Sequence, residues 1–427
     1  MASHAEHSSP AELEQRAHAW FMTRDPRAMW PALDPAALQP AADAIGRVVP
    51  LLLGGREDGG LLAEIDVADD RAAYALGIAG LLTGVGPLLG WGAERGMLGV
   101  GAPAAPVLAE HLRQGRARAA RIGSGLRHAI AALNAAGITP TVMKGMHTAY
   151  AYFPDPGTRP ASDADIIVAP AQVPRAEAAL RDAGFTPSTH VRVPYKRDWY
   201  PADDDPRLHS VELFDARDRW KLEVHGGVVF DRLLNHTLDL LDGAGATLPW
   251  RTFGVEARVP APAPLVALLA VHASGELSRR RLLRLVEMAL VVRYEAGRGA
   301  LDWDAVSATL ERTRATRLAF PALAQLERLL PGTVEPALLH RARRAAGYFA
   351  RRVAGRITAT APILPDQVVL SDRLMWCTSP RDLLWKASVW LRPAPSGTWR
   401  DALRVYHMRL RLLLGGRVSW GLSSRAR

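Results

Sequence analysis

Residues 138–168 read ITPTVMKGMHTAYAYFPDPGTRPASDADIIV, and this stretch decides the fold. It begins as a strand, continues as a helix and ends in SDADIIV, a second strand bounded by turn residues. Alternation along that second strand places Asp163 and Asp165 on one face. The opposite face carries Ala164, Ile166 and Val168. Two carboxylates about 7 Å apart can share one or two magnesium ions. The pattern predicts a metal site suited to phosphoryl chemistry, the alternative being two solvated aspartates at a strand end.

A lysine and a glycine stand at the strand-to-helix turn of the same stretch. Lys144-Gly145 follows the strand-like ITPTVM and precedes the helix. Backbone N–H groups at such a turn bind phosphate, and a lysine adds a positive charge beside them. The spacing differs from the GxxxxGK[ST] of a P-loop. We expect a phosphate-binding turn, with a solvated loop lysine as the alternative.

A third carboxylate is needed to hold two metal ions. The runs HSVELF (209–214) and KLEVHGGVVF (221–230) flank a polar turn, which predicts a hairpin. On the second run, period two places Lys221, Glu223 and His225 on one face. We expect Glu223 to be the third ligand or the general base. Glu212 on the first run is the rival, and an ordinary polar edge strand is the alternative to both.

The remainder of the chain has a helical character on both sides of this α/β segment. We expect an α+β protein in four parts: an N-terminal helical region (1–136), an α/β core (137–258), a helical domain (259–340) and a basic, Trp-rich helical region (341–427). PAPAP at 260–264 is the expected boundary after the core. The uncharged run 72–93 is long enough to cross a bilayer, but its glycines and Pro87 favour two short buried helices around a turn.

The charge of the chain is unevenly distributed. The formal net charge is +10, yet residues 341–427 hold 17 Lys and Arg against 4 Asp and Glu. Such a region could attract nucleic acid, an anionic membrane surface or an acidic protein, or could be a solvated basic face over buried tryptophans. Cys377 is the single cysteine, so no internal disulfide is possible. With no secretory pattern in the first residues, we expect a cytoplasmic protein.

Taken together, the order of these motifs resembles the nucleotidyltransferase superfamily, whose fold is shared by polymerase-β-like and aminoglycoside nucleotidyltransferases. The quoted segments TVMKGMHTAYAYF, TRPASDADIIV, LEVHGGV and LVALLAVHASGE resemble most closely the bacterial branch called uncharacterised nucleotidyltransferases, over roughly residues 70–295. The resemblance implies a small mixed-sheet nucleotidyltransferase core flanked by N-terminal and C-terminal helical domains.

The resemblance also implies roles for particular residues. The metal ligands would be Asp163, Asp165 and Glu223, and these would also be the catalytic residues. The nucleotide contacts would come from Lys144, Gly145, Arg159 and His225. His272 matches a histidine in the following helical segment, although a core histidine is the alternative. Glu223 departs from the usual aspartate by one methylene, and Lys144-Gly145 replaces the Gly-Ser pair of most other branches.

Two functions follow from the resemblance. In the first, the chain uses Mg²⁺ or Mn²⁺ to transfer a nucleoside monophosphate from a nucleoside triphosphate, ATP by expectation, and releases pyrophosphate. The acceptor would be a small molecule, a peptide or an RNA. In the second, a catalytically weakened site leaves a binding module that recruits an anionic partner through residues 341–427.

Overall fold

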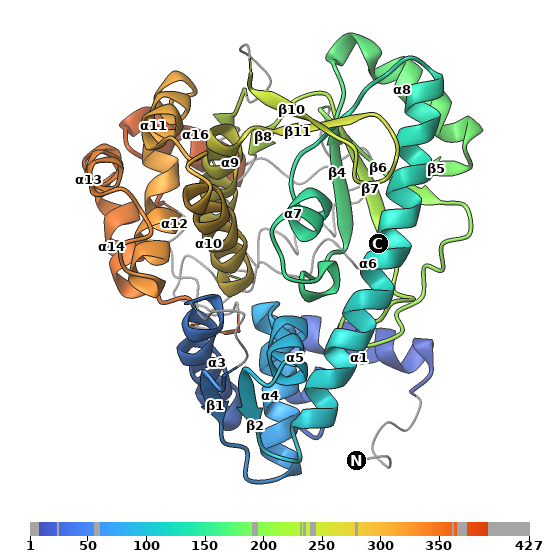
Figure 1. Ribbon diagram of the computed structural model, residues 1–427, viewed down its shortest axis with the longest axis vertical. Coiled ribbons are helices and arrows are strands. Elements are labelled where there is room, and N and C mark those ends of the chain that lie inside the picture. Colours follow the sequence, from blue (N-terminus) through green and yellow to red (C-terminus); the bar gives the residue numbers. More distant parts are fainter. Residues whose placement is uncertain are drawn as a thin grey trace.

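A seven-stranded mixed sheet forms the upper right part of the computed structural model as drawn in Figure 1. The structure describes residues 8–391 except 24, 55–59, 190–194, 231–232, 234–235, 240–244, 278–280, 361–362 and 365–373. In sheet order, the strands are β10 (Thr247–Trp250), β11 (Ala257–Pro260), β3 (Thr141–Val142), β4 (Asp163–Ile167), β7 (Lys221–His225), β6 (Lys196–Pro201) and β5 (Phe185–Pro187). The pairs β11–β3 and β4–β7 are parallel, and the other neighbours are antiparallel. The expected α+β class with a mixed sheet is confirmed.

The two faces of the sheet pack against different helices. Helices α6 (Ala105–Ala135) and α8 (Val173–Asp182) cover one face, where Leu126 and Ile130 join Ala164, Ile166 and Val168 in one apolar core. Ile167 belongs instead to a second core with helix α9 (Pro262–Gly275). Figure 1 shows α6 on one side of β4 and β7, and α9 with α10 (Arg281–Gly297) on the other. The predicted division of strand 163–168 between an apolar face and an acidic face is therefore confirmed.

Short connections carry the chain between these elements. The helix α7 (Met146–Ala151) follows β3 directly, and 3-10 turns at Pro156–Thr158 and Pro170–Gln172 lie on either side of β4. A separate pair of strands, β8 (Val229–Phe230) and β9 (His236–Thr237), follows β7.

The N-terminal region is helical, as expected, with one two-stranded parallel sheet in addition. It contains α1 (Pro10–Thr23), α2 (Pro26–Met29), α3 (Pro35–Gly54), β1 (Ala63–Ile65), α4 (Asp70–Thr83), α5 (Gly86–Glu94) and β2 (Leu98–Val100). The uncharged run 72–93 forms the buried helices α4 and α5, which meet at 119° across Gly84, a residue with φ of 78°. Only glycine adopts that backbone conformation at little cost. By length and composition, α3 could cross a membrane, and the bent pair could do so if it were one span; buried core helices have the same properties.

Helices also make up the C-terminal part. After α9 and α10 come α11 (Trp303–Arg312), α12 (Thr316–Leu329), α13 (Pro336–Ala345), α14 (Tyr348–Arg356) and α16 (Pro380–Leu391). Trp376 is buried in the core that these helices share with α9. Trp399 and Trp420 of the basic region lie outside the described residues, as does the Trp390 side chain.

The predicted hairpin is wrong. Residues 209–214 form bends and irregular structure, and β6 occupies the antiparallel position beside β7. The alternation of this segment has another cause, because Val211 packs into the N-terminal helices and its carbonyl accepts a hydrogen bond from Trp30 Nε1 at 2.7 Å. The Ser210 hydroxyl oxygen accepts hydrogen bonds from the backbone N–H groups of Glu212 and Leu213. These bonds form a local turn in place of a strand ladder.

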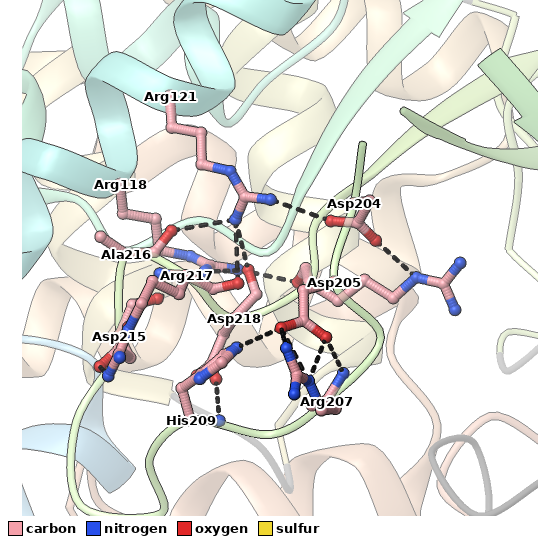
Figure 2. A network of polar contacts seen from close by, with 11 residues as sticks. Arg118, Arg121, Asp204, Asp205, Arg207, His209, Asp215, Ala216, Arg217 and Asp218 are labelled. Atoms are coloured by element: carbon pink, nitrogen blue, oxygen red, sulfur yellow. Dashed lines mark hydrogen bonds and ion pairs between the residues drawn. The ribbon is translucent and has the colours of Figure 1, made fainter. Parts of the chain in front are cut away.

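Two arginines of α6 hold the long connection from β6 to β7 (Figure 2). Arg118 is buried and donates to the carbonyl oxygens of Ala161, Asp215, Asp218 and Arg219 at 2.5 to 3.1 Å. Ala161 lies two residues before β4 and Arg219 two residues before β7, so one guanidinium joins the beginnings of both strands. Arg121, the other arginine, donates to carbonyls of residues 216–218 and to the Asp204 carboxylate.

We expect Arg118→Met to lower the free energy of unfolding by about 3 kcal/mol, because it leaves several buried carbonyls without donors. The matched control is Arg113→Met on the same helix, where the exposed side chain pairs with Glu110 at the surface. That control should cost about 0.5 kcal/mol or less. Urea unfolding followed by circular dichroism measures both, and equal midpoints for the two variants would contradict the role given to Arg118.

Candidate active site

The pairing of β4 with β7 brings the predicted acidic residues together. In this parallel pair, Asp163 lies opposite Lys221, Asp165 opposite Glu223, and Ile167 opposite His225. Leu222 and Val224 of β7 point into the α6 core, as period two predicts. The side chains of Glu223 and His225 therefore lie on the same face as Asp165.

Asp165, Glu223 and His225 form a compact group of buried ligand atoms. One atom from each lies within 4.8 Å of the others. His225 Nε2 is 3.2 Å from Asp165 Oδ1 and 3.5 Å from Glu223 Oε2. Carboxylate oxygens with one imidazole nitrogen suit Mn²⁺ and similar divalent ions, and carboxylates suit Mg²⁺. The donor set fits a divalent metal.

Asp163 stands beside this group rather than within it. It lies two residues before Asp165 on β4 and is half-buried, and among the described residues it forms no ion pair. Burial raises its pKa, and the charges of Asp165 and Glu223 raise it further. The predicted trio of carboxylates is thus gathered on one face, with His225 nearer to Asp165 and Glu223 than the sequence implied.

Positive charges hold the other two carboxylates ionised. Burial acts to raise the pKa of Asp165, but the Lys144 ammonium at 2.5 Å and the hydrogen bond from His225 outweigh it and hold the pKa well below its usual range. Burial also acts to raise the pKa of Glu223, and His225, Lys196 and Lys221 together lower it to about 2. The site therefore keeps both groups as anions.

Lys196 was not predicted as a neighbour of Glu223, whereas Lys221 was expected on the same face of the strand. Lys196 Nζ lies 2.6 Å from Glu223 Oε2, and Lys221 Nζ lies 2.5 Å from Glu223 Oε1. Lys221 also pairs with Asp198 of β6 at 2.7 Å. A signal in the composition could have found them, because the chain has 49 arginines and four lysines, and three of the four lysines meet here.

A buried glutamate supports the Lys144-Gly145 turn from behind. Glu287 of α10 accepts from Arg159 Nε at 2.9 Å and Arg159 Nη2 at 3.0 Å, from Arg284 at 3.2 Å, and from the Thr148 hydroxyl. The Gly145 N–H also donates to it, at 3.4 Å, so this amide points into the protein. Gly145 has φ of 70°, a conformation that favours glycine. An acidic residue within the apolar run of α10 was the available signal, because a fully buried carboxylate requires a buried partner.

Comparison with protein families matches residues 83–331 to the family described as uncharacterised nucleotidyltransferase. The chain belongs to this family. The match contains β4, β7, the Lys144-Gly145 turn and α10, and it indicates nucleotidyl transfer as the general activity. No curated protein matches the chain, and no solved structure matches it.

Two further candidate residues of this nucleotidyltransferase, His272 and Glu212, lie at different distances from the acidic group. His272 of α9 lies close enough to the site for its pKa to be held well below the usual value, by burial first and then by the charges of Lys144 and Arg284. Glu212 lies away from this group, since it accepts a hydrogen bond from Tyr74 and pairs with Arg16. The geometry favours Glu223 over Glu212 as the third carboxylate.

We expect Glu287→Ala to lower the free energy of unfolding of this nucleotidyltransferase by about 3–5 kcal/mol, because it leaves Arg159 and Arg284 without their buried counterion. The matched control is Glu110→Ala, which removes an exposed pair with Arg113 and should cost about 1 kcal/mol or less. Thermal unfolding of the two variants beside the wild type gives the comparison. A Glu287 variant as stable as the control would show that the network does not hold the turn.

Proposed function

We propose that this nucleotidyltransferase transfers a nucleoside monophosphate from a nucleoside triphosphate, ATP in the first instance, to an acceptor and releases pyrophosphate. The observation that carries the proposal is the convergence of Asp163, Asp165 and Glu223 on one face of two paired parallel strands, next to Lys144. The acceptor would be a hydroxyl, amine or carboxylate of a small molecule, a peptide or an RNA.

In this proposal Asp165 and Glu223, with His225, would hold a first Mg²⁺ or Mn²⁺, and Asp163 would contribute to a second. A bound divalent ion would supply charge neutralisation for the phosphates and activation of the attacking group. Glu223 is also the residue that would accept the proton of the acceptor, since it is the carboxylate that β7 places directly opposite Asp165. Its longer side chain is accommodated by Lys196 and Lys221, which contact one oxygen each.

The nucleotide contacts divide between residues that touch the phosphates and residues that position them. We assign the phosphate contact to the Lys144 ammonium, because the Gly145 amide already donates to Glu287. Gly145 would supply the backbone conformation that aims Lys144 at the site. Arg159 was expected to contact nucleotide, but its Nε and Nη2 groups both donate to Glu287, which favours a positioning role.

The four-part division of the chain belongs to the same proposal. Residues 137–258 would form the catalytic core, flanked by helical parts at 1–136, 259–340 and 341–427. The α9 and α10 helices of the third part contribute His272 and Glu287, which lie against the proposed site. The acceptor pocket would then be bounded by these helices rather than by the sheet alone.

A specific observation also favours the second candidate function, a binding module with a weakened site. Ammonium groups of Lys144, Lys196 and Lys221 sit on two of the three proposed metal ligands. If they stay there, the chain would bind anionic partners without transferring a nucleotide, and the basic region 341–427 would recruit the partner.

Thermal shift with Mg²⁺ and each nucleoside triphosphate tests the proposal. We expect wild-type protein to be stabilised when both are present, by about 2.7 kcal/mol at a nucleotide concentration 100 times its dissociation constant. Asp163→Asn with Asp165→Asn should abolish the stabilisation and reduce pyrophosphate release on the order of 100-fold or more. The matched control is Asp205→Asn, a partly exposed aspartate that pairs with Arg207. Stabilisation that is absent, or that survives in the double variant, would contradict transferase chemistry at this site.

A further inference from the structure

Three ammonium groups occupy the carboxylates of the proposed site. Lys144 pairs with Asp165, Lys196 with Glu223, and Lys221 with both Glu223 and Asp198. The carboxylates are nearly enclosed, with side-chain exposures of 4% for Asp165 and 7% for Glu223. Charges that are buried away from water interact strongly with one another. The net charge of this group of side chains therefore governs which ions can bind to it.

The balance is close to neutral without any ligand. The carboxylates of Asp165, Glu223 and Asp198 pair with the three ammonium groups and the His225 imidazole, and Asp163 lies opposite Lys221 in the strand register. A divalent cation that arrives alone must displace ammonium groups from their partners and leave them uncompensated. A triphosphate that arrives alone is repelled by the negatively charged carboxylates. A metal and a triphosphate that arrive together satisfy both sets of charges.

We propose that Lys144, Lys196 and Lys221 are internal counterions that occupy the carboxylates until metal and triphosphate bind, and that these two ligands therefore bind with strong positive coupling. The inference rests on the proposed function, since it concerns the same site. Lys144 and Lys196 would each leave a carboxylate for a phosphate oxygen, and Lys221 would keep Asp198, while the metal takes Asp165 and Glu223. Metal alone and nucleotide alone would bind weakly.

The choice of lysine in an arginine-rich chain supports this exchange. Arginine forms a rigid bidentate fork, whereas lysine is a compact charge on a flexible stem that can change partners. The site uses arginine for its permanent pair, Arg159 with Glu287, where two hydrogen bonds fix both groups. Among the described residues, the ion pairs of Asp165 and Glu223 other than those with His225 are made by lysine.

Lys196 is the position that separates this proposal from a purely structural role. Among the described residues, Glu223 is its ion-pair partner, whereas Lys221 keeps Asp198 when Glu223 is taken by a metal. Lys196 lies on β6, and its side chain is 27% exposed, which leaves it room to turn toward a ligand. Removal of this charge should therefore make Glu223 easier for a metal to take.

Mn²⁺ binding to the full chain, followed by electron paramagnetic resonance, tests the coupling. We expect the Mn²⁺ affinity to rise at least 10-fold in the presence of a non-hydrolysable ATP analogue, after correction for Mn²⁺ bound by the free analogue. Lys196→Met should tighten Mn²⁺ binding without the analogue about 5-fold or more and should reduce the coupling. The control is Lys386→Met, which alters the fourth lysine, on α16, and should behave as wild type.

The outcomes separate the two proposals. Mn²⁺ binding that is equally tight with and without the analogue would overturn the coupling and leave the proposed function standing. Mn²⁺ that binds under neither condition would overturn the proposed function, and the coupling with it. A Lys196→Met variant with unchanged Mn²⁺ affinity would overturn the role of Lys196 as a counterion of Glu223. If Lys196→Met does not fold, the Mn²⁺ affinity of Lys196→Gln tests the same role, and the coupling measured on the wild type tests the proposal without any variant.

Discussion

The parallel pairing of β4 with β7 is the constraint on which the candidate site depends. Its register sets Asp165 beside Glu223 and leaves Asp163 beside Lys221. A slip of one residue would turn these side chains into the α6 core and bring Leu222 or Val224 to the polar face. The apolar residues of both strands prevent such a slip, because they are buried beneath α6 and α8.

Contacts away from the carboxylates help to hold the two strands and the Lys144-Gly145 turn in position. Arg118 ties the segment before β4 to the segment before β7, so that the two strands begin together. Glu287 reaches from α10 to the Lys144-Gly145 turn and to Arg159, and so fixes the position from which Lys144 meets Asp165. The helices after the sheet are thus joined to the site by a buried ionic network. Because removal of one partner of such a network leaves an uncompensated charge, the helices and the sheet depend on each other.

The sequence patterns predicted what periodicity and turn chemistry control. The two faces of β4 and β7, the turn at Gly145 and the helices of the 72–93 run all follow from local rules, and the structure has them. β6 was missed because KRDWYP alternates no apolar face, and it is held in the sheet by Trp199 and by its pairing with β7. The pattern of 209–214 predicts a strand, but the structure buries Val211 against the N-terminal helices, which are far away in sequence. Lys196 and Glu287 reach the site through such long-range packing, which periodicity does not encode. The domain boundaries and the roles of the site residues stay predictions.

The central claim is that one set of carboxylates holds lysines in one state and metal with nucleotide in another. A crystal structure of the chain with Mn²⁺ and a non-hydrolysable ATP analogue, with anomalous scattering used to place the metal, tests it most directly. The account predicts a Mn²⁺ peak bonded to Asp165 and Glu223, phosphates against Lys144, and Lys196 turned away from Glu223. A nucleotide bound elsewhere, or lysines still paired with Asp165 and Glu223 and no metal between them, would contradict it.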